Sequence, residues 1–87
     1  MYSLYFTQEA RKDYKLVNKS IYKIKIQKLL TLIENNPFQH PPPYKKLIAY
    51  SEAYSRRINL QHRLFYQVDE EGKRIKILRM WSHYGDN

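Results

Sequence analysis

Residues 54–81 read YSRRINLQHRLFYQVDEEGKRIKILRMW, and this stretch decides the fold. Apolar and polar side chains alternate along it with a period of two, which is the pattern of half-buried β-strands. We predict strands over residues 54–60, 62–68 and 74–81. The segment Asp69-Glu-Glu-Gly72 lies between the last two strands and is typical of a hairpin turn. The C-terminal half is therefore expected to form three consecutive antiparallel strands.

The same period assigns side chains to the two faces of the sheet, because successive residues of a strand point in opposite directions. In the first two strands one parity is apolar, and we expect it to face the helices (Ile58, Leu60, Leu64, Tyr66 and Val68). The other parity carries Arg57 and Arg63, which we expect side by side on the opposite face. The third strand leaves its parity open, since both Ile77 and Leu78 are apolar.

Outward from this stretch, the N-terminal part of the chain is predicted to contain one short strand and two helices. Residues 2–6 are β-prone, and Thr7 is a suitable N-cap for a helix over 8–18. Ser20 is suitable as the cap of a second helix, which ends before Asn35-Asn36-Pro37. We therefore expect an α+β fold of order β-α-α-β-β-β, with two N-terminal helices packed on one face of a small, mostly antiparallel sheet.

Residues 37–53 join the two halves and are predicted to be a loop. All four prolines of the chain lie here, three of them in the run Pro41-Pro42-Pro43, which favours extended polyproline-like backbone. Long loops in small domains tend to be functional.

The size and charge of the chain restrict its function. Its 87 residues fit a single domain, residues 1–87. Sixteen Lys and Arg against eight Asp and Glu give a net charge of +8, which indicates a polyanionic partner: nucleic acid, an anionic membrane surface or an acidic protein.

Several other classes of protein are disfavoured. Without cysteine the chain has no disulfide framework and no thiolate nucleophile, which fits a cytoplasmic protein. No apolar run is long enough to span a bilayer, and the N-terminus lacks the pattern of a signal peptide, so no membrane partner is expected. The three histidines lack the spacing of metal ligands, and we expect neither metal nor cofactor.

The candidate site is built from arginines on the predicted strands and from a histidine that follows them. Arg57 and Arg63 on paired strands would present two guanidinium groups to one phosphate, unless they serve only solubility. His83 follows the last strand and titrates near neutrality, as an acid or base of phosphodiester cleavage must. Arg56 and Arg79 also lie on strands and are counted as phosphate-binding residues.

Attack of the ribose 2′-hydroxyl on the phosphodiester needs a base, an acid and cations that stabilise the charged transition state. These arginines and His83 would supply the acid and the cations without a metal, whereas the base is not evident from the residues.

At these positions the chain resembles the YoeB/Txe toxins of the RelE/ParE superfamily. The matching text comprises Asn36-Pro-Phe-Gln39, Lys46-Leu47, Tyr54-Ser-Arg-Arg-Ile-Asn59, Gln61-His-Arg-Leu-Phe-Tyr66 and Trp81-Ser-His-Tyr84. The resemblance implies the toxin of a type II toxin–antitoxin pair in the bacterial cytoplasm. Such a toxin is a metal-independent endoribonuclease, an mRNA interferase that enters the A site of the 70S ribosome, cleaves mRNA and inhibits translation. It further implies a cognate YefM-type antitoxin and leaves open whether the chain forms a homodimer.

Residue by residue, the resemblance makes Arg63 the counterpart of the family's catalytic Arg, His83 of its catalytic His and Tyr84 of its active-site Tyr. Arg57 matches a basic residue that lines the same site. The family's Glu, commonly read as the general base, is replaced here by Lys45.

The replacement by Lys45 leaves several interpretations open. In the first interpretation His83 or a water molecule takes over the role of base, and cleavage is attenuated. In the second, Glu52 of the same loop substitutes for the missing Glu. Alternatively, the chain only binds its antitoxin or the ribosome, or it inhibits DNA gyrase as ParE proteins do. Whether Lys45 is natural or introduced does not follow from the sequence. In every case Lys45 and Lys46 add positive charge to the expected RNA-binding face.

Overall fold

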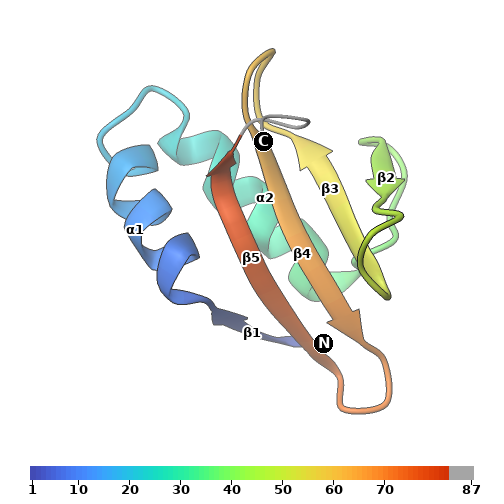
Figure 1. Cartoon of the computed structure of the whole chain (residues 1–87). Helices are drawn as coiled ribbons and strands as arrows, with labels where there is room; N and C mark the ends of the chain where they lie inside the picture. Colours follow the sequence, from blue (N-terminus) through green and yellow to red (C-terminus); the bar gives the residue numbers. More distant parts are fainter. Residues whose placement is uncertain (83–87) are drawn as a thin grey trace.

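The computed structural model describes residues 1–82 and confirms the α+β fold class. Its elements are β1 (Ser3–Phe6), α1 (Gln8–Val17), α2 (Lys23–Asn35), β2 (Tyr44–Lys46), β3 (Ala53–Arg57), β4 (Arg63–Asp69) and β5 (Arg74–Ser82). The five strands form one sheet in the order β1-β5-β4-β3-β2, and α2 crosses behind it while α1 lies beside β5 (Figure 1). β1 is parallel to β5, and the other neighbours are antiparallel.

The loop predicted over residues 37–53 contains an additional strand, β2. Its three residues pair with β3 at the edge of the sheet, with Lys45 opposite Ser55. The prediction missed β2 because three residues are too few to display a period. In addition, residues 44–46 form a strand only by pairing with β3.

β3 ends three residues earlier than predicted, at Arg57. The side-chain oxygen of Asn59 accepts hydrogen bonds from the backbone N–H groups of Gln61 and His62, at 2.8 and 2.7 Å, and this local turn competes with the strand. Leu60 is therefore 91% exposed, and the prediction that it faces the helices is wrong.

The predicted cap of the first helix is confirmed, and that of the second is not. The Thr7 hydroxyl accepts from the backbone N–H of Ala10 at 3.0 Å. Ser20 instead closes a turn, accepting from the N–H of Tyr22 and donating to the carbonyl of Val17. α2 begins at Lys23 without a side-chain cap, so its stability depends on the packing of its apolar face.

The core lies between the helices and one face of the sheet. It contains buried side chains from both helices, from the three central strands and from Ile58 directly after β3 (Ala10, Val17, Ile26, Leu29, Ile33, Tyr54, Ile58, Leu64, Tyr66, Val68, Ile75, Ile77 and Met80). The sequence left open which side chains of β5 face the core. A shift of register against β4 buries both Ile77 and Met80, although they are three residues apart. Neither helix of residues 1–82 is long and apolar enough to cross a membrane.

Candidate nucleic-acid interface

The face of the sheet that turns away from the helices carries the candidate site. Arg57 lies directly opposite Arg63, Ser55 opposite Phe65, and Lys45 opposite Ser55. Directly opposed residues share a face, and the alternate residues of β4 are buried on the helix side. These five residues therefore lie together on what we call the open face. The prediction that Arg57 and Arg63 are neighbours on one face is confirmed.

Arg63 is more enclosed than its charge suggests. Only 7% of its surface is exposed, and its Nε donates to the hydroxyl of Ser55 at 3.0 Å. Arg63 is therefore largely buried, whereas its neighbour Arg57 is exposed. The open face thus combines a guanidinium group held by its neighbour with one at the surface.

Arg56, predicted to bind phosphate, points into the interior. It has no exposed surface, and its Nε donates to the hydroxyl of Tyr66 at 3.1 Å. Its terminal nitrogens donate to the carbonyls of Pro37, Gln39 and Pro42 at 2.6–2.9 Å. A guanidinium group offers five N–H donors. Arg56 makes four hydrogen bonds, three of them to the loop of residues 37–42 and one to Tyr66 on β4. Arg56 is thus unavailable to an RNA phosphate and instead anchors the loop that leads into β2.

Two further residues of the predicted phosphate-binding set are not available at the candidate site, although Arg79 lies opposite Phe65. Arg79 donates to both carboxylate oxygens of Asp13 on α1, at 2.8 and 3.2 Å, and these bonds raise the pKa of Arg79. Lys46 lies opposite Tyr54, whose side chain is in the core, so Lys46 is on the other side of β2 from Lys45. Of the strand cations, Lys45, Arg57 and Arg63 remain at the candidate site.

An aromatic cluster holds β2 in place. Phe38, Tyr44, Tyr54 and Tyr66 contact one another with ring centroids 5.2–6.1 Å apart. The Arg56 guanidinium lies 4.9 Å from the Tyr44 ring, within cation–π distance. The cluster fixes Tyr44, and because strand residues alternate it directs Lys45 to the open face. This aromatic cluster was not predicted from the sequence. Tyr54 has the same parity as Ile58, which was expected to face the helices, and this parity was a signal that Tyr54 is also buried.

Glu52 does not join the candidate site. It precedes β3, whereas Arg57 ends that strand about 17 Å away along an extended chain, and Arg63 lies opposite Arg57 on β4. Its carboxylate accepts from the hydroxyl of Tyr54 at 3.1 Å. Burial, followed by this hydrogen bond, raises the pKa of Tyr54 to about 12. The hypothesis that Glu52 substitutes for the missing base is therefore not carried further.

The end of β5 lies next to Arg63. Ser82 is directly opposite Arg63 in the sheet, and Trp81 stacks on His62 with ring centroids 4.0 Å apart. His62 thus packs against the end of β5. The predicted site residues His83 and Tyr84 fall outside the described residues. Within residues 1–82, no group of three His, Cys, Asp or Glu side chains is placed to hold a metal ion.

Comparison with known proteins gives consistent matches in sequence and structure. A family model described as the YoeB-like toxin of bacterial type II toxin–antitoxin systems matches residues 6–84. The YoeB/ParE toxin from Agrobacterium tumefaciens superposes with a TM-score of 0.84 at 26% identity, covering 94% of this chain and 99% of that one. A search of curated protein sequences returned no match.

Two structures from Staphylococcus aureus are more similar in sequence. The YoeB dimer has a TM-score of 0.81 at 34% identity, covering 95% of this chain and 98% of that one. The toxin of the heterotetrameric YoeB–YefM complex has a TM-score of 0.78 at 34% identity, covering 97% and 99%.

Proposed function

Because this chain belongs to the YoeB-like toxins of bacterial type II toxin–antitoxin systems, we propose that it is a ribosome-dependent endoribonuclease that cleaves mRNA in the ribosomal A site. The observation that carries the proposal is the register of the sheet. It brings Lys45, Arg57 and Arg63 to one open face, beside the strand end that leads into His83. A basic open surface next to a titratable group suits a phosphodiester substrate.

In the proposed reaction the ribose 2′-oxygen forms a bond to phosphorus while the bond to the 5′-oxygen breaks. Arg63, held by Ser55, stabilises the negative charge that gathers on the phosphoryl oxygens. Arg57 binds the phosphate from the opposite position on β3. His83 donates a proton to the leaving 5′-oxygen, and Tyr84 belongs to the same site. No step requires a metal ion.

The general base of this reaction is not supplied by position 45, where the family's Glu is replaced by Lys45. A lysine ammonium group has three N–H donors and no acceptor, so it does not take the proton of the 2′-hydroxyl. We propose that Lys45 binds substrate phosphate, and that water or His83 removes the proton. Cleavage is then slow compared with a variant that carries a carboxylate at this position.

The partner in the proposal is a YefM-type antitoxin, as in the complex from Staphylococcus aureus. Its toxin-binding segment should be acidic and partly apolar, because it must neutralise the cations of the open face and cover exposed apolar side chains such as Ile48. Co-purification from the native operon, followed by sequencing of the partner, tests this. A basic partner would contradict it. The YoeB dimer supports homodimer formation by the free toxin.

A binding-only toxin is the second candidate, and Lys45 is the observation that favours it. Such a protein would occupy the A site without cutting. Single-turnover primer extension on programmed ribosomes separates the two candidates. We expect Arg63→Ala and His83→Ala to slow cleavage by about 10²–10⁴, the usual effect of losing one such group.

Arg11→Ala is the matched control, because Arg11 is an exposed arginine on α1. It should cleave like the parent. If the parent leaves the mRNA intact while still binding ribosomes, the binding-only candidate is the better one.

A further inference from the structure

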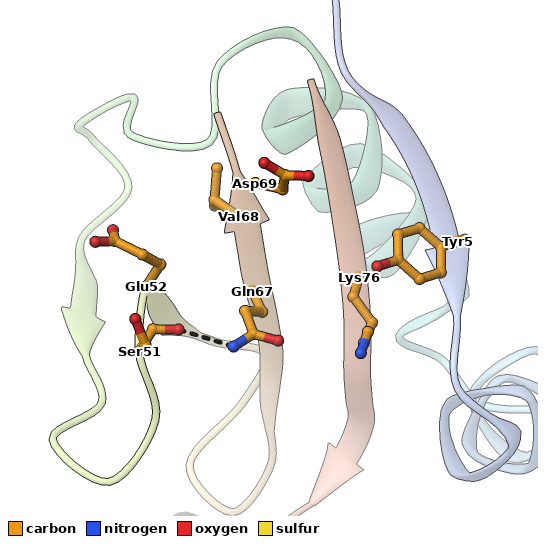
Figure 2. Close-up of a pocket in the computed structure, with 7 residues that line it drawn as sticks. All are labelled: Tyr5, Ser51, Glu52, Gln67, Val68, Asp69 and Lys76. Carbon is orange, nitrogen blue, oxygen red and sulfur yellow. Dashed lines mark hydrogen bonds between the residues drawn. The ribbon is translucent and has the colours of Figure 1, made fainter. Parts of the chain in front are cut away.

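A hollow of about 260 Å³ lies on the open face, at the end of β4 away from Arg63 (Figure 2). Four side chains in register run across the sheet here: Tyr5 opposite Lys76, Lys76 opposite Gln67, and Gln67 opposite Ala53. The volume is below the roughly 300–1,000 Å³ of pockets for drug-sized ligands, so the hollow suits one small group.

Gln67 is held in one orientation at this hollow. Its side-chain nitrogen donates to the backbone carbonyl of Ser51 at 2.8 Å, which identifies the other amide atom as the oxygen. Figure 2 shows this oxygen turned away from Ser51, toward the Lys76 side of the hollow. A fixed amide oxygen accepts hydrogen bonds and so favours a ligand with an N–H donor at that point.

Tyr5 provides an aromatic surface at the opposite side of the hollow. It is 42% exposed, and two cations lie over its ring at the outer limit of cation–π distance, the Arg74 guanidinium at 5.8 Å and the Lys76 ammonium at 5.9 Å from the centroid. An exposed aromatic ring flanked by cations is the combination with which proteins hold unpaired nucleotides, since the ring stacks on a base and the cations attract the phosphates.

The two carboxylates at the hollow are already engaged by protein groups. Asp69 accepts from the backbone N–H of Gly72 at 3.0 Å and from Arg74 at 3.4 Å. Glu52 accepts from the hydroxyl of Tyr54 and points away from the other lining residues in Figure 2. Their partners reduce the repulsion that a nearby phosphate would experience.

The hollow and the proposed cleavage site share one face of one strand. Gln67 lies four residues beyond Arg63 on β4, which corresponds to about 13 Å along an extended chain. An RNA strand held at Arg63 therefore reaches the hollow within a few nucleotides.

We infer that the hollow is a subsite for one unpaired base of the RNA substrate. The base stacks on Tyr5 and its exocyclic amino group donates to the Gln67 oxygen, while Lys76 and Arg74 contact the adjoining phosphates. Adenine, cytosine and guanine carry such an amino group, whereas uracil offers only its N3–H, which is flanked by two carbonyl oxygens that repel the Gln67 oxygen. The inference rests on the proposed function and adds a base preference to it.

Equilibrium binding in the absence of ribosomes tests the subsite separately from cleavage. The probes are labelled oligo(A), oligo(C) and oligo(U) of equal length with 2′-O-methyl riboses, which the enzyme has no means to cut, measured at low salt. We expect the parent to prefer oligo(A) and oligo(C) to oligo(U). Tyr5→Ala should weaken binding of all three about tenfold, in the range of one lost base–aromatic stack. Tyr50→Ala, which removes an exposed tyrosine outside the hollow, should bind like the parent.

Gln67→Leu should remove the preference for amino-bearing bases and leave the affinity for oligo(U) unchanged. The inference is overturned if Tyr5→Ala binds like the parent, if the parent does not distinguish oligo(U) from oligo(A), or if no oligonucleotide binds. The Arg63→Ala variant should keep the base preference while losing cleavage. Absence of cleavage by the parent would overturn the proposed function without changing these binding results.

Discussion

Arg63 on β4 and Ser55 on β3 are joined by a hydrogen bond of 3.0 Å from the guanidinium Nε to the serine hydroxyl. Both residues are buried, Ser55 completely and Arg63 to all but 7% of its surface. Ser55 is also the residue of β3 that lies opposite Lys45. One buried hydroxyl thus links Arg63, which we propose binds phosphate, to Lys45 across the sheet, at the position where the resemblance places the family's Glu.

This link predicts that Ser55 positions Arg63 during cleavage. Ser55→Ala should slow single-turnover cleavage about tenfold, which corresponds to about 1.4 kcal/mol, as expected for losing a hydrogen bond to a charged group. Ser55→Thr keeps the hydroxyl and should retain most of the rate. Equal rates for Ser55→Ala and the parent, with unchanged melting curves, would show that Arg63 needs no such support.

Lys45 and Lys46 form a matched pair for testing the missing base, because they are adjacent but lie on opposite sides of β2. Lys45→Glu places a proton acceptor on the open face opposite Ser55, the residue that binds Arg63, and should raise the cleavage rate by about 10²-fold or more. Lys46→Glu makes the same change of charge on the other side and should not. If both variants cut at the parental rate, the carboxylate is not what limits the reaction.

The neighbouring arginines Arg56 and Arg57 should differ sharply in their effect on stability. Arg56→Met removes the donor to the carbonyls of Gln39 and Pro42 and to the Tyr66 hydroxyl, whereas the Pro37 carbonyl keeps its hydrogen bond from Tyr66; we expect the variant to lower the free energy of unfolding by about 3 kcal/mol. Arg57→Met, at an exposed position, should change it by less than about 0.5 kcal/mol. Urea unfolding of both variants measures the difference, and similar midpoints would mean that the loop does not depend on Arg56.

Asp13 should contribute to the acid sensitivity of the fold. Burial would raise its pKa, but hydrogen bonds from Arg79 and from the backbone N–H of Met80 outweigh burial, so the pKa lies below its ordinary value of 3.8. A carboxyl group whose pKa is depressed by folding stabilises the native state above the unfolded pKa. This contribution is lost as the pH falls through the folded pKa.

Urea unfolding of the parent and of Asp13→Asn at several values between about pH 6 and pH 2 measures this contribution. We expect the variant to lose less stability on acidification than the parent. Asp69→Asn is the control, because Asp69 also has a lowered pKa but lies at the surface, where solvent screens its interactions. An unchanged pH dependence in Asp13→Asn would contradict the prediction.

Several features followed from the sequence alone because they depend on local periodicity and on turn chemistry. The period of two predicted the three central strands, and the turn at Asp69–Gly72 made the last two antiparallel. Alternation then placed Arg57 and Arg63 on one face, and the register confirms it. The hydroxyl of Thr7 capped the first helix as predicted, since a cap involves only residues within one turn.

Other features were decided only by the tertiary structure, because they depend on groups distant in the sequence. Arg56 has the same parity as the buried Ile58, yet its charge suggested a surface role. Burying it requires carbonyl groups from residues 37–42, which pack against β3 only in the folded chain. Lys45 likewise reaches the open face because an edge strand forms where β3 has unpaired backbone groups. Periodicity is a property of neighbouring residues, whereas the partner of a buried charge or of an edge strand is set by packing of the whole domain.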